Sequence, residues 1–478
     1  MRIFLPETRL IENKPQMTKA TSEVAGSFRD PSGYVYLRDN ELYRQVNHSY
    51  QEEFDLFLES GLCQYLIDAG LLIRHTEVGV EHAASNGAYR VIKPERIPFV
   101  SYPYEWCFSQ LKDAALLTLE IQAKAFDAGM SLKDSSAYNV QFVGSKPIFI
   151  DTLSFERYRE GQPWVAYRQF CQHFLAPLAL MSHVDVRLHQ LLRIYLDGIP
   201  LNLTSRLLPK RTQLSFGLLS HIHLHAKAQE RFSESSMPST SRKVGRTSFL
   251  GLVDSLRSTI GRLSWQAGGT EWHEYYDKTN YSDTAFQHKQ QLVAKMLERV
   301  IPRPACVWDL GANEGIFSRI PSSQGIRTVS FDIDPAAVET NYLQARIEEQ
   351  GNTLPLILDL ANPSPGIGWA NRERMALVER GPADTAMALA LIHHLAISNN
   401  LPFGKIARFL GEICHTLIIE FVPKSDSQVQ RLLSTREDIF SEYHQDSFDV
   451  EFSKIFSIEH RETIRDTERT LYLMEARG

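Results

Sequence analysis

Residues 307–317 read VWDLGANEGIF, an apolar run that carries an acid and leads into a loop with two glycines. An apolar run that passes directly into a glycine-containing turn is typical of the first strand and first strand-to-helix connection of a doubly wound α/β sheet. In such sheets the ligand binds at the carboxyl ends of the strands, and glycines allow the backbone to approach it closely. The stretch therefore predicts an α/β domain with a ligand site at Gly311 and Gly315.

The C-terminal half of the chain alternates between short apolar runs and amphipathic segments. Runs that are apolar throughout are typical of strands buried on both faces, so we expect a mostly parallel Rossmann-like sheet with helices between its strands. The expected strands are 305–311, 327–334, 355–360, 384–391 and 416–423, and the expected helices are 283–300, 335–350 and 402–415. Two final runs, 456–464 and 469–477, are expected to form an antiparallel pair at the edge of the sheet.

The charges around the glycine loop indicate which ligand it holds. A pyrophosphate site would read G-x-G-x-x-G and be lined by uncharged amides, whereas this loop is G-A-N-E-G, with Glu314 beside Asn313. Asp309 also favours a ligand with positive charge. Asp332 ends the second run, where a carboxylate can accept hydrogen bonds from both ribose hydroxyls, and Asp359 ends the third, where it can accept from an adenine amino group. S-adenosylmethionine, a sulfonium with an amino group and an adenosine, fits this pattern.

The set of acids around the loop resembles class I S-adenosylmethionine-dependent methyltransferases, and the likeness covers about 270–478. Their first motif, D-x-G-x-x-x-G, is present here as Asp309, Gly311 and Gly315, and Asn313 stands where many members carry a further glycine. The resemblance implies methyl transfer to an acceptor. It also implies a cofactor site formed by Asp309, Gly311, Asn313, Gly315, Asp332 and Asp359.

Two histidines follow the expected fourth strand, in ALIHHLAISNN (390–400). An oxygen nucleophile needs a proton acceptor during methyl transfer, and in the family this segment lines the acceptor pocket. His393 or His394 is therefore a candidate base, although paired histidines at such a turn can also cap or pack. Upstream, the aromatic residues Trp272, Tyr275, Tyr276 and Tyr281 are candidates for a lid over the cofactor or for packing at a junction.

The N-terminal half carries a second pattern of acids. Asp134 and Asn139 are spaced like the catalytic-loop Asp and Asn of protein kinases, and Asp151 follows where a kinase has its metal-holding Asp. The resemblance implies a two-lobed kinase-like domain with ATP and magnesium, in which Asp134 orients the acceptor and Asn139 and Asp151 hold the metal. However, the glycine-rich phosphate loop is absent, and Arg44 stands in place of the expected lysine. These departures favour a degenerate lobe that binds a ligand or partner.

The combination of these two halves resembles the NoeA-related methyltransferases, a bacterial group named after host-specific nodulation proteins. Three stretches carry the likeness: SYPYEWCFSQLKDAAL (101–116), DTLSFERYREGQPWVAYRQFCQHFLAPLAL (151–180) and IIEFVPKSDSQVQRLL (418–433). The group's name implies a link to glycan or cell-surface chemistry. Both a glycan and a small molecule therefore remain candidates for the methyl acceptor.

Composition and charge bound the remaining possibilities. The net charge of −6 gives no bulk attraction to nucleic acid, no apolar run reaches the length of a membrane span, and the five dispersed cysteines favour free thiols in the cytoplasm. The alternatives to a methyltransferase are a phosphotransferase or a non-enzymatic scaffold. We expect a tail at 1–29, an α+β kinase-like domain at 30–231, a linker at 232–250 and the methyltransferase domain at 251–478.

Overall fold

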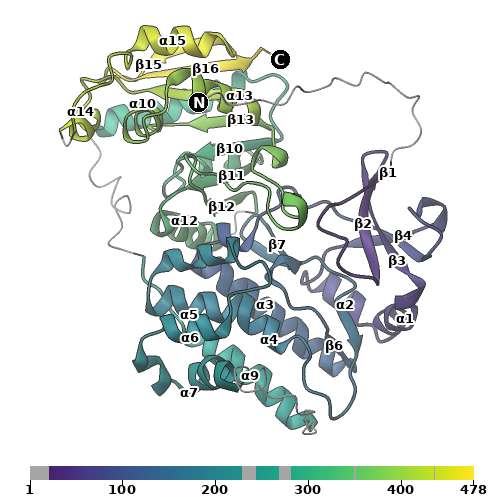
Figure 1. Ribbon diagram of the computed structural model, residues 1–478. Coiled ribbons are helices and arrows are strands. Elements are labelled where there is room, and N and C mark those ends of the chain that lie inside the picture. Colours follow the sequence, from purple (N-terminus) through teal and green to yellow (C-terminus); the bar gives the residue numbers. More distant parts are fainter. Residues whose placement is uncertain (1–20, 229–243, 268–280, 349–350, 435, 478) are drawn as a thin grey trace, which may run out of the picture. The chain divides into compact units, whose positions relative to one another are not determined.

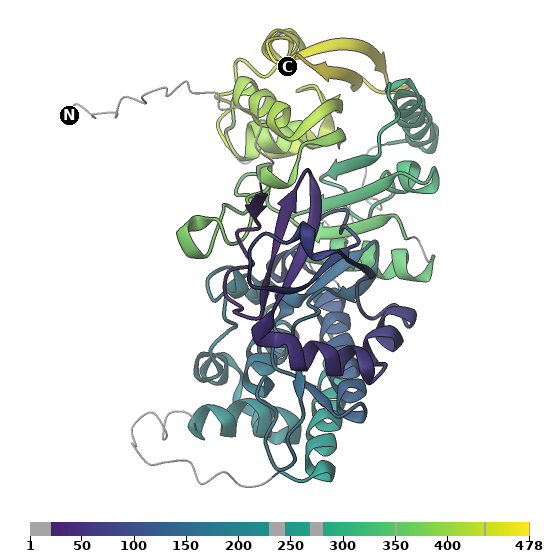
Figure 2. The same cartoon turned by 90° about the vertical axis from the view of Figure 1, so that its right-hand side faces the viewer.

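The computed structural model describes residues 21–228, 244–267, 281–348, 351–434 and 436–477 (Figures 1 and 2). It divides into two compact units. The first contains residues up to 51 together with 74–96, and the second contains 52–73 together with 97–478. Each unit is described by itself below.

The first unit is a five-stranded antiparallel sheet in the order β1-β2-β3-β5-β4. Tyr36 and Tyr43 stack on its buried face with ring centroids 5.7 Å apart, and Val91 completes this small core. Its strands are β1 (Thr21–Glu23), β2 (Gly33–Arg38), β3 (Glu41–Asn47), β4 (His75–Val78) and β5 (Ala88–Pro94).

The N-terminal part of the second unit is built around helix α3 (Phe108–Asp127). At the start of α3 the Gln110 side chain accepts a hydrogen bond from the Cys107 amide, and just beyond its end Gly129 adopts a left-handed conformation. Most of α3 is buried because short strand pairs and helices surround it. The elements of this part are α1 (Gln51–Glu59), α2 (Leu62–Asp68), the pair β6 (Met130–Leu132) with β9 (Phe155–Arg157), the pair β7 (Val140–Val143) with β8 (Lys146–Phe149), α4 (Tyr167–Phe170), α5 (Ala176–His183), α6 (Leu201–Leu207), α7 (Phe216–Leu218) and α9 (Arg246–Arg262), of which α2, β6, β8, α5 and α9 contact α3.

The C-terminal part of the second unit is a seven-stranded sheet in the order β12-β11-β10-β13-β14-β16-β15. Its first five strands are parallel, and β16 runs antiparallel between β14 and β15. This confirms the predicted α/β fold with an antiparallel last strand. The strands are β10 (Cys306–Leu310), β11 (Arg327–Asp332), β12 (Thr353–Ile357), β13 (Ala383–Ala388), β14 (Cys414–Phe421), β15 (Phe456–Thr463) and β16 (Thr470–Ala476), and the helices are α10 (Asp283–Arg299), α11 (Arg319–Ser323), α12 (Pro335–Ile347), α13 (Phe403–Ile413), α14 (Ser427–Leu433) and α15 (Gln445–Ser453).

The two faces of this sheet are covered by different elements. One face packs against α10, through apolar side chains that include Val307, Met387 and Ile418. Helix α12 lies on this face too, where Asn341 donates a hydrogen bond to Ser330. On the opposite face, α13 and α15 pack together over the strands toward β15. The carboxyl ends of the parallel strands are therefore positioned by helices on both sides.

Most of the expected linker lies outside the described residues, since 229–243 are not among them. Its last residues, 246–250, belong to α9, which packs against α3. All five cysteines are free thiols, and four of them are buried. Among the residues that the structure describes, none of the helices is both long and apolar enough to cross a bilayer.

Candidate active site

The glycine loop follows β10 and is held over the end of β11 by its own backbone. The amides of Gly311 and Ala312 both donate to the carbonyl of Phe331, at 2.8 and 2.9 Å. Gly311 (φ +75°) and Gly315 (φ +76°) adopt left-handed conformations, and a Cβ on Gly315 would lie 2.3 Å from the Asn341 side chain. These conformations and the close approach explain why glycine occupies both positions.

Asp332 ends β11, as predicted, and its carboxylate joins the loop to the strand end. One oxygen accepts a hydrogen bond from the Asn313 amide at 2.7 Å, and the other accepts from the Asp334 amide at 2.9 Å. Each carboxylate oxygen has a second lone pair, so Asp332 can still accept from a diol. Asn313 itself has φ +49°, an uncommon conformation that asparagine tolerates better than most residues.

Asp309 lies within β10, one residue before its end, and is almost fully buried. The Ser318 hydroxyl donates to it at 2.6 Å. Burial raises the pKa of Asp309 to about 7, with a smaller contribution from Asp332. Burial likewise raises the pKa of Asp332 to about 6. The two carboxylates therefore hold their negative charge only weakly without a cationic or hydrogen-bonding ligand.

Asp359 lies two residues beyond the end of β12, and not at its last residue as the sequence had suggested. Its carboxylate accepts from the Ala361 amide at 2.8 Å and so shapes the turn that opens the connection to β13. The preceding Leu358 amide donates to the Asp332 carbonyl at 2.8 Å, which places Asp359 next to the end of β11. It remains partly exposed.

The two candidate histidines follow β13, where His393 is buried and His394 is partly buried. Their ring centroids lie 4.1 Å apart. His393 is completely buried, and within the described part of the chain neither of its ring nitrogens has a hydrogen-bond partner. Burial lowers the pKa of His393 well below its usual value, and burial lowers that of His394 to about 4. His393 is thus a neutral imidazole with unused hydrogen-bonding capacity.

Beside the glycine loop lies a buried ionic network that the sequence analysis missed. Glu420, near the end of β14, pairs with Lys289 of α10 at 2.7 Å and with Arg469 at 3.3 Å. The Tyr281 hydroxyl donates to Glu420 and accepts from Arg469 at 2.7 Å. Arg469 also pairs with Asp426.

The network connects to both predicted parts of the site. The Lys289 ammonium lies 4.7 Å from the ring centroid of Phe317, two residues after Gly315. Its positive charge lowers the pKa of Asp309 and so opposes part of the effect of burial. On the other side, Glu420 accepts from the amide of Ala390, a left-handed residue (φ +50°) in the turn before His393. A non-glycine residue in this conformation is typical of functional turns. An acid within the apolar run IIEF was the one signal that could have revealed the network.

In the N-terminal half, the structure brings Asp134, Asn139 and Asp151 together. Asn139 hydrogen-bonds to the Asp134 carboxyl, whose pKa is raised by burial and by Asp151. Ser154 donates to Asp151 at 2.5 Å and accepts from Asn139 at 3.2 Å. The three side chains are therefore bonded within their own turns. No group of three or more His, Cys, Asp or Glu side chains suited to a metal occurs in the part of the chain that the structure covers.

Of the expected lid residues, Trp272, Tyr275 and Tyr276 lie outside the described residues. Tyr281 is the first described residue after them, and it belongs to the ionic network.

Known proteins resemble this chain in sequence or in structure. No family model matches the chain. Solved structures similar to it include magnesium protoporphyrin IX methyltransferase from Synechocystis PCC 6803 with bound SAH (16% identical, 43% of this chain and 93% of that one, TM-score 0.31) and the N-methyltransferase NodS from Bradyrhizobium japonicum WM9 (9% identical, 41% and 99%, TM-score 0.30). With TM-scores this low, the fold assignment rests on the strand order of the sheet itself.

A full-length relative gives the family. The chain is 36% identical over 479 residues to the nodulation protein NoeA of Rhizobium meliloti (strain 1021), a match that covers 98% of this chain and 99% of that protein. The chain therefore belongs to the NoeA family.

Proposed function

We propose that this protein is an S-adenosylmethionine-dependent methyltransferase. The observation that carries the proposal is the pairing of a left-handed glycine loop with two buried carboxylates, Asp309 and Asp332, at the carboxyl edge of the sheet. The similarity to structures named as methyltransferases agrees with it but is too distant to add weight.

The residues at this edge fit the proposed cofactor. Asp332 would accept hydrogen bonds from the ribose hydroxyls with the lone pairs left free by Asn313 and Asp334. Asp309 would face the positively charged end of the cofactor, and Asp359 would accept from the adenine amino group. When bound, S-adenosylmethionine supplies an activated methyl group that leaves its sulfonium as a nucleophile attacks in line.

Charge explains why a dinucleotide would fit less well. A pyrophosphate at the loop would meet Asp309 and Asp332, which would then have to remain protonated. A ligand with positive charge instead favours their ionised forms. The loop of this chain thus selects its ligand by the sign of the charge that the ligand brings.

On the acceptor side, we propose His393 as the residue that receives a proton or hydrogen bond from the acceptor. It is buried, neutral and without a partner among the described residues, close to the left-handed turn at Ala390. His394 packs against it and would hold its ring in place. A neutral imidazole at this position can accept a hydrogen bond from the hydroxyl of a glycan or a small alcohol, and its lowered pKa makes it a weak base.

The acceptor can be identified by following a labelled methyl group. Purified protein would be incubated with methyl-labelled S-adenosylmethionine and a cell extract that is separated afterwards into protein, glycan, lipid and small molecules. We expect label in one fraction, with transfer lost in His393→Ala but cofactor affinity kept. Label in no fraction under conditions where the cofactor binds would contradict methyl transfer.

The raised pKa values of the two carboxylates predict opposite effects of pH on affinity and stability. Because the cofactor needs Asp309 and Asp332 ionised, its affinity should rise as the pH increases from 5 to 8, with proton release on binding. The folded-state pKa values, about 7 and 6, lie above the usual value of an unfolded aspartate. The stability they contribute is therefore full at low pH and is lost as the pH rises through 6 and 7.

Calorimetry in buffers of different ionisation enthalpy would count the protons released, and thermal melts of the free protein would follow stability. Affinity that is constant from pH 5 to 8 would show that neither carboxylate contacts the cofactor.

A second candidate is magnesium-dependent phosphotransfer at Asp134, Asn139 and Asp151. One observation favours it, the contact of Asn139 with Asp134 beside Asp151. The engagement of Asp151 and Asn139 with Ser154 opposes it. ATP turnover that is kept in Asp332→Ala but lost in Asp151→Ala would support this activity, and no turnover would exclude it. We propose a cytoplasmic location, which is supported by the odd number and dispersed positions of the cysteines in the sequence.

A further inference from the structure

One face of the C-terminal sheet lacks its own helix beside β12. In a doubly wound sheet the connection between the third and fourth strands normally supplies a helix that covers this face. Here that connection, residues 358–382, is fully described and contains no α-helix, but two short 3-10 turns, η10 (Trp369–Asn371) and η11 (Val378–Arg380), and one antiparallel bridge between Ile367 and Arg374. The apolar side chains of β10, β11 and β12 on this face therefore need another cover.

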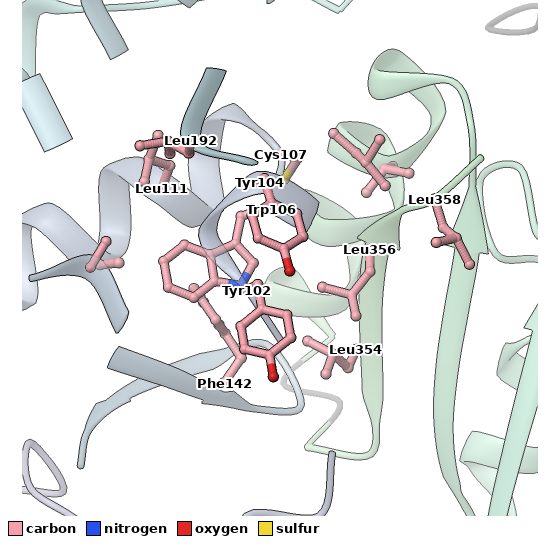
Figure 3. Close-up of a cluster of buried hydrophobic side chains, with 14 of the residues drawn as sticks. Tyr102, Tyr104, Trp106, Cys107, Leu111, Phe142, Leu192, Leu354, Leu356 and Leu358 are labelled. Carbon is pink, nitrogen blue, oxygen red and sulfur yellow. The ribbon is translucent and has the colours of Figure 1, made fainter. Parts of the chain in front are cut away.

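Residues 99–106 from the N-terminal part provide that cover. Phe99 packs edge-on against Trp308 of β10 and Phe331 of β11, with ring centroids 5.5 and 5.8 Å apart. Figure 3 shows the side chains of Tyr102 and Tyr104 beside Leu354, Leu356 and Leu358, with the Trp106 ring on the far side of the two tyrosines from these leucines. All six of these side chains are buried.

The start of α3, directly after this segment, contacts the open edge of the sheet. β12 is the edge strand, and its Pro355 carbonyl accepts a hydrogen bond from the Gln110 side chain at 2.9 Å. At the next helix, Glu339 of α12 accepts from the amide and hydroxyl of Ser109. A polar side chain at the start of α3 thus supplies a hydrogen bond to the edge strand that a neighbouring strand would otherwise make.

Three sets of contacts then fix the connection itself. The Ser364 hydroxyl donates to Tyr104 at 3.2 Å, and the Met375 amide donates to the Tyr102 hydroxyl at 2.7 Å. Arg380 forms a bidentate ion pair with Glu105, at 2.6 and 2.8 Å, in which both side chains are almost fully buried. These contacts hold the connection near its start, in its middle and near its end.

The connection has little regular structure of its own to hold it. At its tip, Gly368 (φ +83°), Ala370 (φ +55°) and Asn371 (φ +57°) are left-handed, and Trp369 between them is 72% exposed. Besides the backbone bridge between Ile367 and Arg374, the contacts with Tyr102, Tyr104 and Glu105 hold its path, because no helix within it packs on the sheet.

We infer that residues 99–110 act as a positioning element for the ligand site, because they hold the connection that begins with Asp359. Tyr102, Tyr104 and Glu105 touch no ligand in this scheme. They hold Ser364, Met375 and Arg380, in the part of the connection that follows the turn from which Asp359 would reach the adenine amino group. This inference rests on the proposed function and adds to it the residues that set recognition of the base.

The test compares two ligands that differ only at that amino group. S-adenosylhomocysteine carries the amino group, and its purine riboside analogue carries a hydrogen in its place. Wild-type protein should prefer the adenosine compound by about tenfold or more, since a carboxylate can accept a hydrogen bond from the amino group but has no such donor in the analogue. Tyr102→Phe leaves the Met375 amide without its acceptor, and we expect the preference to fall at least about threefold.

Two further variants separate positioning from general loss of stability. Ser364→Ala removes the hydrogen bond to Tyr104 and a contact with the adjacent Pro365 carbonyl, and it serves if Tyr102→Phe does not fold. It should also reduce the preference for the adenosine compound. Arg346→Gln is the matched control, since it breaks the 2.7 Å ion pair with Asp113 at the same junction but away from the connection. It should lower the melting temperature and leave the preference unchanged.

The outcomes distinguish this inference from the proposed function. A preference that is unchanged in both Tyr102→Phe and Ser364→Ala, or absent in the wild type, would overturn the positioning role while cofactor binding stands. Failure of the wild type to bind either compound would overturn both. A preference lost equally in Arg346→Gln would also count against a specific role.

Discussion

Replacing Asp332 by alanine is expected to reduce S-adenosylmethionine affinity by about 100-fold or more. The change would remove two charge-assisted hydrogen bonds to the ribose, each contributing about 1.5–3 kcal/mol. It would also remove the 2.7 Å hydrogen bond that the Asn313 amide donates to the Asp332 carboxylate. Both the contact and the shape of the loop would be lost together. Isothermal titration of the purified variant would measure the effect.

Asp384 provides a matched control for this variant. It lies in β13 of the same sheet but near the opposite end, where its carboxylate accepts from the amides of Ala305 and Cys306. Asp384→Ala should lower stability without changing cofactor affinity. Full binding in Asp332→Ala would show that the ligand of this loop is not held through its ribose, and the assignment of the site would fail.

Glu420→Ala is expected to cause the largest loss of stability, about 3–5 kcal/mol in the free energy of unfolding. Glu420 is fully buried and pairs with both Lys289 and Arg469. Its removal would leave Lys289 buried without its ion-pair partner, while Arg469 would keep only Asp426. Chemical denaturation would measure the loss. Glu459→Ala removes an exposed carboxylate on β15 of the same sheet and should change stability by less than about 0.5 kcal/mol.

The same network predicts sensitivity to acid. Burial opposes the ionisation of Glu420, but Lys289 and Arg469 outweigh it and lower its pKa to about 2. A lowered folded-state pKa stabilises the protein above the pKa of an unfolded glutamate, and that stability is lost as the pH falls toward 2. Glu420→Gln should therefore lose less stability relative to the wild type at pH 3 than at pH 7. An equal loss at both pH values would contradict the charge of Glu420 in the folded protein.

The fold of the C-terminal part followed from the sequence because each strand is buried on both faces. Such strands are apolar throughout and stop at polar residues, so five were predicted close to their observed bounds. The glycine loop and Asp332 were predictable for a related reason, since the position of a residue at a strand end places it at the ligand edge. The antiparallel pairing of the last two strands was likewise correct, although β16 lies inside the sheet.

Other features depend on contacts between residues far apart in the chain. Lys289, Glu420 and Arg469 come from three separate elements, and no local pattern links them. The packing of residues 99–106 on β12 could not be predicted from the sequence either. An aromatic-rich segment in the N-terminal half is expected to belong to the hydrophobic core of the N-terminal domain. The offset of Asp359 from the strand end arises from pairing that stops at Ile357.

The central claim is that carboxylates at this edge select a positively charged nucleoside. The most direct measurement is a competitive calorimetric titration of the wild-type protein with S-adenosylmethionine and with NAD at pH 8, where Asp309 and Asp332 are expected to ionise on binding. We predict saturable heat with S-adenosylmethionine and none with NAD, and no displacement of the first by the second. Saturable binding of NAD, with no heat from S-adenosylmethionine, would contradict the claim.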